Sequence, residues 1–352
     1  MRFLLAYLLS LALALVFLPA VIAGGWWSWE KEAGMLAIPG EAAANEELNP
    51  DVNSTLRIYV ADKGVFQEME LEAYVCGVVA AEMPASFHPE ALKAQAVVAR
   101  TYAWQKAGPG GGCQNHPRAA LCTDSTCCQA WIDDHAAREK WPAEEADFYL
   151  ERIQEAVNST RGQVITCKGE LITAVYHSTC GGKTEAAAEL WSGGARSYPY
   201  LQSVDCPYCW NSPYHRLELE MNVSAYTAAL QGEKEALPVL AEGNLPLLEV
   251  VRKSISGRNL QVRMGRPGRL YSGSEVRQLL GLPSTYFGWR VKGEKIIFST
   301  RGHGHGVGMC QYGADGMAKE GMDYAGILKY YYQGIAVENL ASFSGGEVDA
   351  GP

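Results

Sequence analysis

The sequence lacks any run of lysines and arginines, it has no internal repeat, and it contains only one long apolar stretch. Its 30 basic residues are outnumbered by 39 acidic ones, for a formal net charge of −9. This charge balance argues against nucleic acid as a partner, and the single apolar stretch excludes a protein that crosses a membrane several times. The hydrophobic fraction of 48% excludes a wholly disordered chain and is enough for a sizeable core.

The one apolar stretch lies at the N-terminus. Residues 3–23 carry no charge, and as a helix they could span a hydrocarbon core of about 30 Å. Arg2 precedes this stretch and acidic residues follow it, which favours an N-terminus inside and a body outside the cytoplasm. Residues 21–23 also fit a signal-peptide cleavage site, so a cleaved export signal is the alternative. We predict a transmembrane anchor or signal segment at residues 1–25.

The remaining chain divides by composition into a linker, a long folded region and a tail. Residues 30–54 contain few large apolar side chains, so a linker is predicted at residues 26–54, and a disordered tail is predicted at residues 341–352. Helical and strand patterns mix between residues 55 and 340, which indicates an α+β fold. The expected elements are strands at 56–61, 163–167 and 170–177, helices at 71–82, 89–106, 146–158 and 325–332, and short elements of both kinds within 216–300.

The helix expected at residues 71–82 ends in a carboxylate, Glu82. Glu82 follows Val78 and Val79 at helical spacing and therefore shares their apolar face. Desolvation and the negative end of a helix both raise the pKa of a carboxyl group, which is what a general acid needs near neutral pH. The alternative is an ordinary carboxylate that turns outward at a frayed helix end, and spacing alone favours that alternative.

Three longer motifs carry a resemblance to a known family. They are Val79-Ala-Ala-Glu-Met-Pro-Ala-Ser-Phe-His-Pro-Glu-Ala-Leu-Lys-Ala-Gln-Ala-Val-Val-Ala-Arg-Thr-Tyr102, Tyr176-His-Ser-Thr-Cys-Gly-Gly-Lys-Thr-Glu185 and Gly302-His-Gly-His-Gly-Val-Gly-Met-Cys-Gln-Tyr-Gly-Ala314. All three closely resemble the SpoIID family (stage II sporulation protein D), and the similarity extends over roughly residues 55–340. The resemblance implies a SpoIID-like fold in which helices and antiparallel strands form a groove.

The same resemblance implies an activity. Members of this family are peptidoglycan lytic transglycosylases that act during engulfment in sporulation. They cut denuded glycan strands between N-acetylmuramic acid (MurNAc) and N-acetylglucosamine (GlcNAc), and the product carries a 1,6-anhydro-MurNAc end. The catalytic glutamate of the family falls on Glu82, which reverses the interpretation from spacing alone.

A set of residues in the three motifs is expected to bind the glycan. They are polar side chains near the acid, together with a glycine pair whose missing side chains would let a polymer approach closely. Core packing is the more common fate of Arg100 and Tyr102, and His177 or His305 taken alone would more often be structural histidines, but the resemblance favours these residues as part of the groove. The expected substrate-binding residues are Arg100, Tyr102, His177, Ser178, Thr179, Gly181, Gly182, His305, Gln311 and Tyr312.

Four of the ten cysteines cluster between residues 113 and 128. Some family members bind zinc in this segment, and the resemblance implies a zinc cofactor here with a structural role. The expected ligands are His116, Cys122, Cys127 and Cys128, a nitrogen and sulfur set of the kind that holds tetrahedral zinc. The alternative is a disulfide among Cys113, Cys122, Cys127 and Cys128.

The other cysteines give weaker signals. Cys206 and Cys209 have the spacing of a metal half-site but could also form a disulfide, and the sequence favours neither. Cys180 and Cys310 stand inside the family motifs and are predicted to be small buried side chains.

The resemblance implies partners as well as a substrate. A cell-wall amidase would remove the stem peptides, and a further membrane protein would complete the engulfment complex at the engulfing septal membrane. The alternative function is that of a non-catalytic amidase enhancer that binds the wall. A zinc amidase is a weaker alternative, because the histidine and glutamate ligands of a catalytic zinc are missing.

Overall fold

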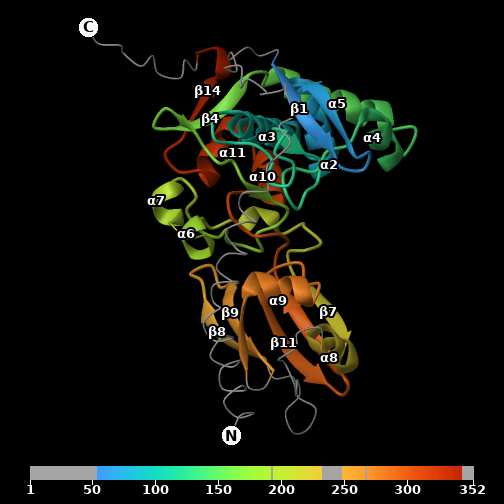
Figure 1. Ribbon diagram of the computed structural model, residues 1–352, viewed down its shortest axis with the longest axis vertical. Coiled ribbons are helices and arrows are strands. Elements are labelled where there is room, and N and C mark those ends of the chain that lie inside the picture. The colour runs from blue at the N-terminus through green and yellow to red at the C-terminus, as the bar shows by residue number, and fades with distance from the viewer. Residues whose placement is uncertain (1–53, 192, 232–247, 266–267, 343–352) are drawn as a thin grey trace, which may run out of the picture. The chain divides into compact units, whose positions relative to one another are not determined.

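A computed structural model of the protein describes residues 54–191, 193–231, 248–265 and 268–342 (Figure 1). The predicted anchor, the predicted linker up to residue 53 and the tail from residue 343 lie outside the described residues. Within the described residues, no helix has both the length and the apolar character that a membrane crossing requires. The described residues all belong to one compact unit.

The described residues form a mixture of helices and small, mostly antiparallel sheets, in agreement with the predicted α+β class. The strands are β1 (Thr55–Val60), β2 (Val65–Glu70), β3 (Leu121–Cys122), β4 (Gln163–Cys167), β5 (Glu170–Leu171), β6 (Tyr176–His177), β7 (Leu217–Asn222), β8 (Leu248–Lys253), β9 (Asn259–Met264), β10 (Arg269–Ser272), β11 (Phe287–Lys292), β12 (Lys295–Thr300), β13 (Met309–Cys310) and β14 (Ala336–Asn339). The longer helices are α2 (Leu71–Glu82), α3 (Pro89–Ala107), α4 (Asp134–Lys140), α5 (Ala146–Ser159), α8 (Val223–Gln231), α9 (Gly273–Leu279), α10 (Gln311–Lys319) and α11 (Tyr324–Tyr331), and the short ones are α6 (Ala187–Leu190), α7 (Gly194–Ser197), η1 (Pro207–Cys209) and η2 (Leu340–Ser342).

Helix α3 is the centre of the larger core. It begins at Pro89, where the missing N–H costs nothing in the first turn, and the His88 side chain accepts a hydrogen bond from the Glu90 N–H at 3.3 Å. Helices α2, α5, α10 and α11 and strand β4 pack around it (Figure 1). Because the helix is covered on several sides, nearly all its residues from Ala91 to Trp104 are buried.

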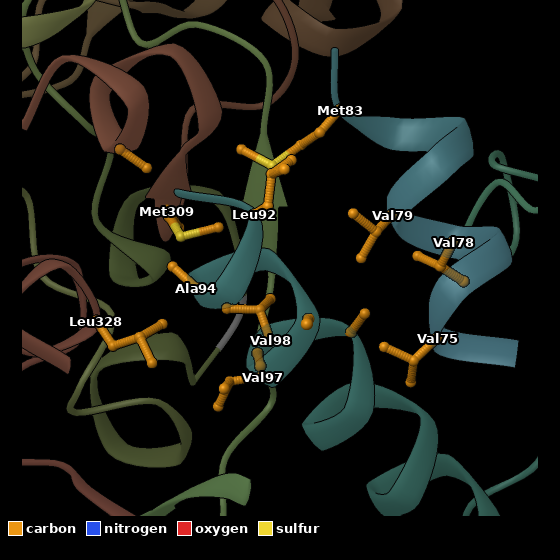
Figure 2. Packing of buried hydrophobic residues seen from close by; sticks show 14 of the residues in the cluster. Val75, Val78, Val79, Met83, Leu92, Ala94, Val97, Val98, Met309 and Leu328 are labelled. Carbon is orange, nitrogen blue, oxygen red and sulfur yellow. The ribbon is translucent and has the colours of Figure 1, made fainter. Parts of the chain in front are cut away.

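The packing between α2 and α3 fixes where α2 ends. Val75 and Val79 point from α2 toward α3, and Met309 lies on the far side of α3 (Figure 2). Burial of each such valine contributes roughly 1.5–3 kcal/mol. The chain turns to extended geometry at Met83, before Pro84, so α2 ends at Glu82 as the sequence predicts.

Two elements differ from the expectation. The strand predicted at 170–177 is divided into β5, which pairs with β4, and β6, which pairs in parallel with β13. A tight turn closed by Val175 N–H and the Thr173 carbonyl separates them. Helix α10 was not predicted, because its glycines are poor helix formers. In the structure, one of these glycines, Gly316, packs closely against the Tyr208 backbone.

The described residues between 217 and 300 have a hydrophobic core of their own. Strands β11, β12 and β7 form one antiparallel sheet, and β10, β9 and β8 form another. Their core includes Tyr226, Val262, Phe287 and Phe298. The short helices and strands predicted for this region are present.

Candidate active site

Glu82 lies on a large groove with a volume of about 1080 Å³. Segments far apart in the sequence line it, because α2, the loop after the cysteine-rich segment, β6 and the glycine-rich loop meet there. The lining residues that bear on the chemistry are Glu82, Tyr102, Gln129, Lys140, Trp141, Glu145, Tyr149, Tyr176, His177, Ser178, Tyr214, Arg277, His303, His305, Gln311 and Tyr312.

The Glu82 carboxyl is half-buried and has defined partners. Ala130 N–H donates to Glu82 Oε1 at 2.9 Å. Burial raises the pKa of Glu82, and the hydrogen bonds from Ala130 and Tyr176 and the positive charge of Lys140 oppose this effect in part. The expected direction of the pKa shift is therefore confirmed, with desolvation as its largest cause.

A short chain of hydrogen bonds orients the hydroxyl of Tyr176 toward Glu82. Tyr74 Oη donates to Gln129 Oε1 at 3.4 Å, and Gln129 Nε2 donates to Tyr176 Oη at 3.2 Å. Because Tyr176 Oη already accepts from Gln129, its own proton is available for the Glu82 carboxyl. The acid is thus held by one backbone and one side-chain donor.

Two histidines line the groove in the neutral form. His177 Nδ1 lies 3.1 Å from the Val307 carbonyl and must carry the proton, which leaves Nε2 as a buried acceptor without a protein partner. His305 Nδ1 accepts from Val307 N–H at 3.1 Å, so its proton is on Nε2. Burial lowers the pKa of His177 well below its ordinary value and that of His305 to about 4.

The glycine-rich loop lets these histidines approach each other. Gly304 has φ +99°, and a Cβ there would lie 3.0 Å from the Cβ of His177. The rings of His177 and His305 have centroids 5.7 Å apart. Any other residue at position 304 would have a strained backbone, and its side chain would crowd His177 in the groove.

Six of the ten expected substrate-binding residues line the groove together with Glu82. Gln311 is tied to the acid's own backbone, because its Nε2 donates to the Glu82 carbonyl at 3.2 Å. Tyr312 packs edge-on against Phe87, with ring centroids 4.9 Å apart. The six residues are Tyr102, His177, Ser178, His305, Gln311 and Tyr312.

The structure corrects the expectation for Arg100. Its side chain is fully buried and forms two hydrogen bonds to Glu72, from Nε to Oε1 at 2.8 Å and from Nη2 to Oε2 at 2.6 Å. Nη1 also donates to the Gln163 carbonyl at 3.1 Å. Arg100 therefore joins α3 to α2 and β4 and does not reach the groove.

Thr179, Gly181 and Gly182 are likewise not among the lining residues. The Thr179 hydroxyl is buried against Ser212 Oγ at 2.6 Å. A Cβ on Gly181 would meet the backbone of Arg301 at 2.9 Å, so this glycine allows two loops to pack and not a polymer to approach.

Several lining residues were missed from the sequence. Tyr176 and His303 stand inside the quoted motifs and could have been chosen from them. Lys140, Trp141 and Tyr149 lie on or between α4 and α5, where no motif marks them, and Arg277 comes from α9.

The cysteine-rich segment brings four sulfurs together. The Sγ atoms of Cys113, Cys122, Cys127 and Cys128 all lie within 4.8 Å of one another. His116, which was expected in this set, instead stacks on Tyr59 with ring centroids 3.6 Å apart. Cys113 takes the fourth place, and four sulfurs fit a tetrahedral zinc ion at least as well as the expected set.

The comparisons with known proteins agree with the motifs. A family model described as SpoIID, stage II sporulation protein, matches residues 60–167. Stage II sporulation protein D of Bacillus subtilis (strain 168) is 32% identical over 347 residues, which is 96% of each chain. Stage II sporulation protein D of Bacillus amyloliquefaciens is 33% identical over 289 residues, 81% of this chain and 79% of its own.

A protein with another printed function is also similar. An amidase enhancer of Bacillus subtilis (strain 168) is 29% identical over 306 residues, which is 74% of this chain and 40% of its own length. The similarity to the two stage II proteins, in contrast, covers most of the length of both chains. On this basis, the chain belongs to the SpoIID family of sporulation proteins.

Proposed function

We propose that the protein is a peptidoglycan lytic transglycosylase that cleaves denuded glycan strands between MurNAc and GlcNAc. The observation that carries this proposal is the half-buried Glu82 carboxyl, whose pKa is raised and which lines a groove of about 1080 Å³. That volume is at the upper end of the range for small-molecule pockets, which suits a segment of a polymer. The two neutral histidines suit a substrate made mainly of hydroxyl and amide groups.

The reaction needs one group that both gives and accepts a proton. Protonated Glu82 donates to the glycosidic oxygen as the bond from MurNAc C1 to that oxygen breaks. The C6 hydroxyl of the same MurNAc attacks C1, and its proton passes to the Glu82 carboxylate. One strand then ends in 1,6-anhydro-MurNAc, the other in a free GlcNAc hydroxyl, and no water is consumed. Intramolecular attack adds the advantage of proximity.

Other groove residues orient the acid and the sugar. Ala130 N–H and Tyr176 Oη stabilise the carboxylate after proton transfer, since both donate to it. His177 Nε2 is an acceptor without a protein partner, and a sugar hydroxyl can donate to it.

The cysteine set beside the groove supports a structural zinc site. Cys128 lines the groove, and Gln129 and Ala130, which hold Tyr176 and Glu82, follow it directly. Zinc held by Cys113, Cys122, Cys127 and Cys128 would order this loop. The ion would hold in place Ala130, which donates to Glu82, and Gln129, which orients Tyr176.

We further propose a place and partners for this activity. An anchor at residues 1–25 would hold the body outside the cytoplasm at the engulfing septal membrane. A cell-wall amidase would strip the strands first, and a membrane protein of the engulfment complex would hold both enzymes together. The similarity to an amidase enhancer favours a second candidate, a non-catalytic protein that stimulates such an amidase.

Product analysis separates the candidates. Denuded glycan is incubated with the parent protein, with Glu82→Gln and with Glu145→Gln, and the fragments are analysed by mass spectrometry. Glu145 is the matched control because it is the other acidic residue among the described residues that line the groove. We expect 1,6-anhydro ends from the parent and from Glu145→Gln, and none from Glu82→Gln.

Two outcomes would count against the proposal. Reducing ends labelled from ¹⁸O water, lost in both variants, would indicate a hydrolase with two carboxylates. No cleavage by the parent, together with stimulation of an amidase by both parent and Glu82→Gln, would indicate the enhancer.

A further inference from the structure

The cysteines outside the cysteine-rich segment are also brought together. The Sγ atoms of Cys180, Cys206, Cys209 and Cys310 all lie within 4.8 Å of one another, and all four side chains are buried. They come from three segments: Cys180 follows β6, Cys206 and Cys209 flank η1, and Cys310 ends β13. The sequence favoured neither a metal nor a disulfide for Cys206 and Cys209. The structure places two further sulfurs beside this pair.

The spacing of the sulfurs matches a tetrahedral ion. A zinc–sulfur bond is about 2.3 Å long, which places the sulfurs of a tetrahedral site about 3.8 Å apart. The sulfurs of Cys180 and Cys209 are 3.5 Å apart, and no pair exceeds 4.8 Å. Four mutually adjacent sulfurs are what a single central ion requires, whereas disulfides would need only two separate pairs.

Every sulfur also faces a polar group that can donate to it. Cys310 Sγ accepts from the backbone N–H of Cys180 and of Gly313, both at 3.3 Å, and Cys180 Sγ accepts from Gly182 N–H at 3.4 Å. Tyr331 Oη lies 3.1 Å from Cys206 Sγ. His215 Nδ1 lies 3.6 Å from Cys209 Sγ. Such donors stabilise thiolates, the form that binds a metal, and orient the ligands.

The surroundings are shaped closely around the sulfurs. A Cβ on Gly313 would lie 2.5 Å from Cys206 Sγ and 2.1 Å from Tyr331 Oη, so only glycine fits at the start of α10. Zinc with four thiolates carries a net charge of −2, and the buried guanidinium of Arg258 lies beside the set, with Nη2 donating to the Cys180 carbonyl at 2.7 Å. This guanidinium also faces the buried Glu185 through Ser256. The guanidinium and the N–H donors above together offset part of the charge. A buried charge requires such compensation.

We propose that Cys180, Cys206, Cys209 and Cys310 bind a structural zinc ion as four thiolates. The ion cross-links the strand pair β6 and β13, which pairs His177 with Cys310. His177 precedes Cys180 in the chain, and Gln311 follows Cys310 directly, so this zinc site holds the part of the groove that contains both. The inference stands on the cysteines alone and does not depend on the transglycosylase activity.

Metal content tests the proposal in the full chain. Zinc per chain is measured by mass spectrometry for the parent, for Cys180→Ser and Cys209→Ser, and for Cys167→Ser as a matched control outside both cysteine sets. We expect each test variant to hold one zinc ion fewer than the parent and to melt several degrees lower. The control is expected to equal the parent in both measurements.

A second measurement keeps the proposal testable where a variant fails to fold. X-ray absorption of the folded Cys122→Ser/Cys127→Ser protein, in which the other cysteine set is disabled, should show zinc with four sulfurs at about 2.3 Å. Peptide mapping of the parent that finds Cys180, Cys206, Cys209 or Cys310 in disulfides would overturn the proposal. Equal zinc content in the parent and in folded Cys180→Ser, or iron in place of zinc, would also overturn it.

Discussion

The groove is lined by two sets of residues that respond to burial in opposite ways. The acid set is Glu82 with Gln129, and Ala130 N–H donates to Glu82 from behind the lining residues; the histidine set is His177 with His305. Burial raises the pKa of Glu82 and lowers the pKa of both histidines. The same desolvation therefore favours the protonated form of the carboxyl, which can donate a proton, and the neutral form of the imidazoles, which cannot act as imidazolium acids. This contrast supports the proposal that Glu82, and not a histidine, donates the proton to the glycosidic oxygen.

The two sets also differ in how the chain assembles them. Glu82 is the last residue of α2, and Met83-Pro84 in the sequence determines where that helix ends. Ala130, which donates to Glu82, lies on the loop that follows the cysteines of residues 113–128. His177 and His305 are brought together by the parallel pairing of β6 and β13 and by glycines. The predictions below test each half of this contrast.

Removing the acid should have the largest effect. Glu82→Gln keeps the volume of the side chain but cannot transfer a proton, so we expect kcat for glycan cleavage to fall by about 10²–10⁴-fold. Timed release of 1,6-anhydro ends from denuded glycan measures it. A variant that retains more than a tenth of the parent rate would remove Glu82 from the mechanism.

Breaking the buried ion pair between Arg100 and Glu72 should have the next largest effect. Arg100→Met leaves Glu72 buried without its partner, which we expect to lower the free energy of unfolding by about 3–5 kcal/mol. Urea denaturation measures the change. Arg263→Met is the matched control, because its pair with Glu249 is exposed and should contribute about 1 kcal/mol or less.

Replacing His177 should have a smaller effect on catalysis. His177→Ala removes one acceptor for the substrate, and we expect kcat/KM to fall about tenfold, in line with the loss of one hydrogen bond. The decline of kcat/KM as pH rises through the raised pKa of Glu82 should remain, because His177 does not supply the proton. If this decline disappears in His177→Ala but not in the control His135→Ala, the assignment of the acid is wrong.

The smallest effect concerns stability and pH. The pKa of Glu82 is higher in the folded protein than in the unfolded chain, so ionised Glu82 opposes folding above that pKa. Glu82→Gln removes this penalty and should melt slightly higher than the parent at neutral pH. The difference should vanish as pH falls below the ordinary carboxyl pKa of about 4.3. Melting temperatures of both proteins across this range provide the test, and a constant difference would contradict it.

Sequence reasoning worked best where local pattern and packing agree. The bounds of α2 match the prediction, because apolar spacing starts the helix and Met83-Pro84 ends it. The prediction was wrong where a polar side chain could either line the groove or be buried with a partner in the core. Arg100 is polar and lies on the helix that packs against α2, but the buried carboxylate of Glu72 binds its guanidinium, and no local pattern shows that pairing.

The cysteines show the same limit. The cluster of cysteines within residues 113–128 is visible in the sequence, but the expected set of His116 with three cysteines is not, because His116 stacks on Tyr59 and Cys113 lies with the other three sulfurs. Cys180 and Cys310 were predicted only as buried residues, because the nearest partner of Cys180 in the chain is Cys206 and that of Cys310 is Cys209, both too distant for a local motif.

The sequence by itself determined the family, the mixture of helices and strands, and the acid at the end of α2, since each depends on residues that are near neighbours in the chain. Tertiary structure alone decided which polar side chains reach the groove, which histidines are buried there and which cysteines lie together. Those properties depend on burial and on distances between remote segments, and only the folded chain defines these quantities.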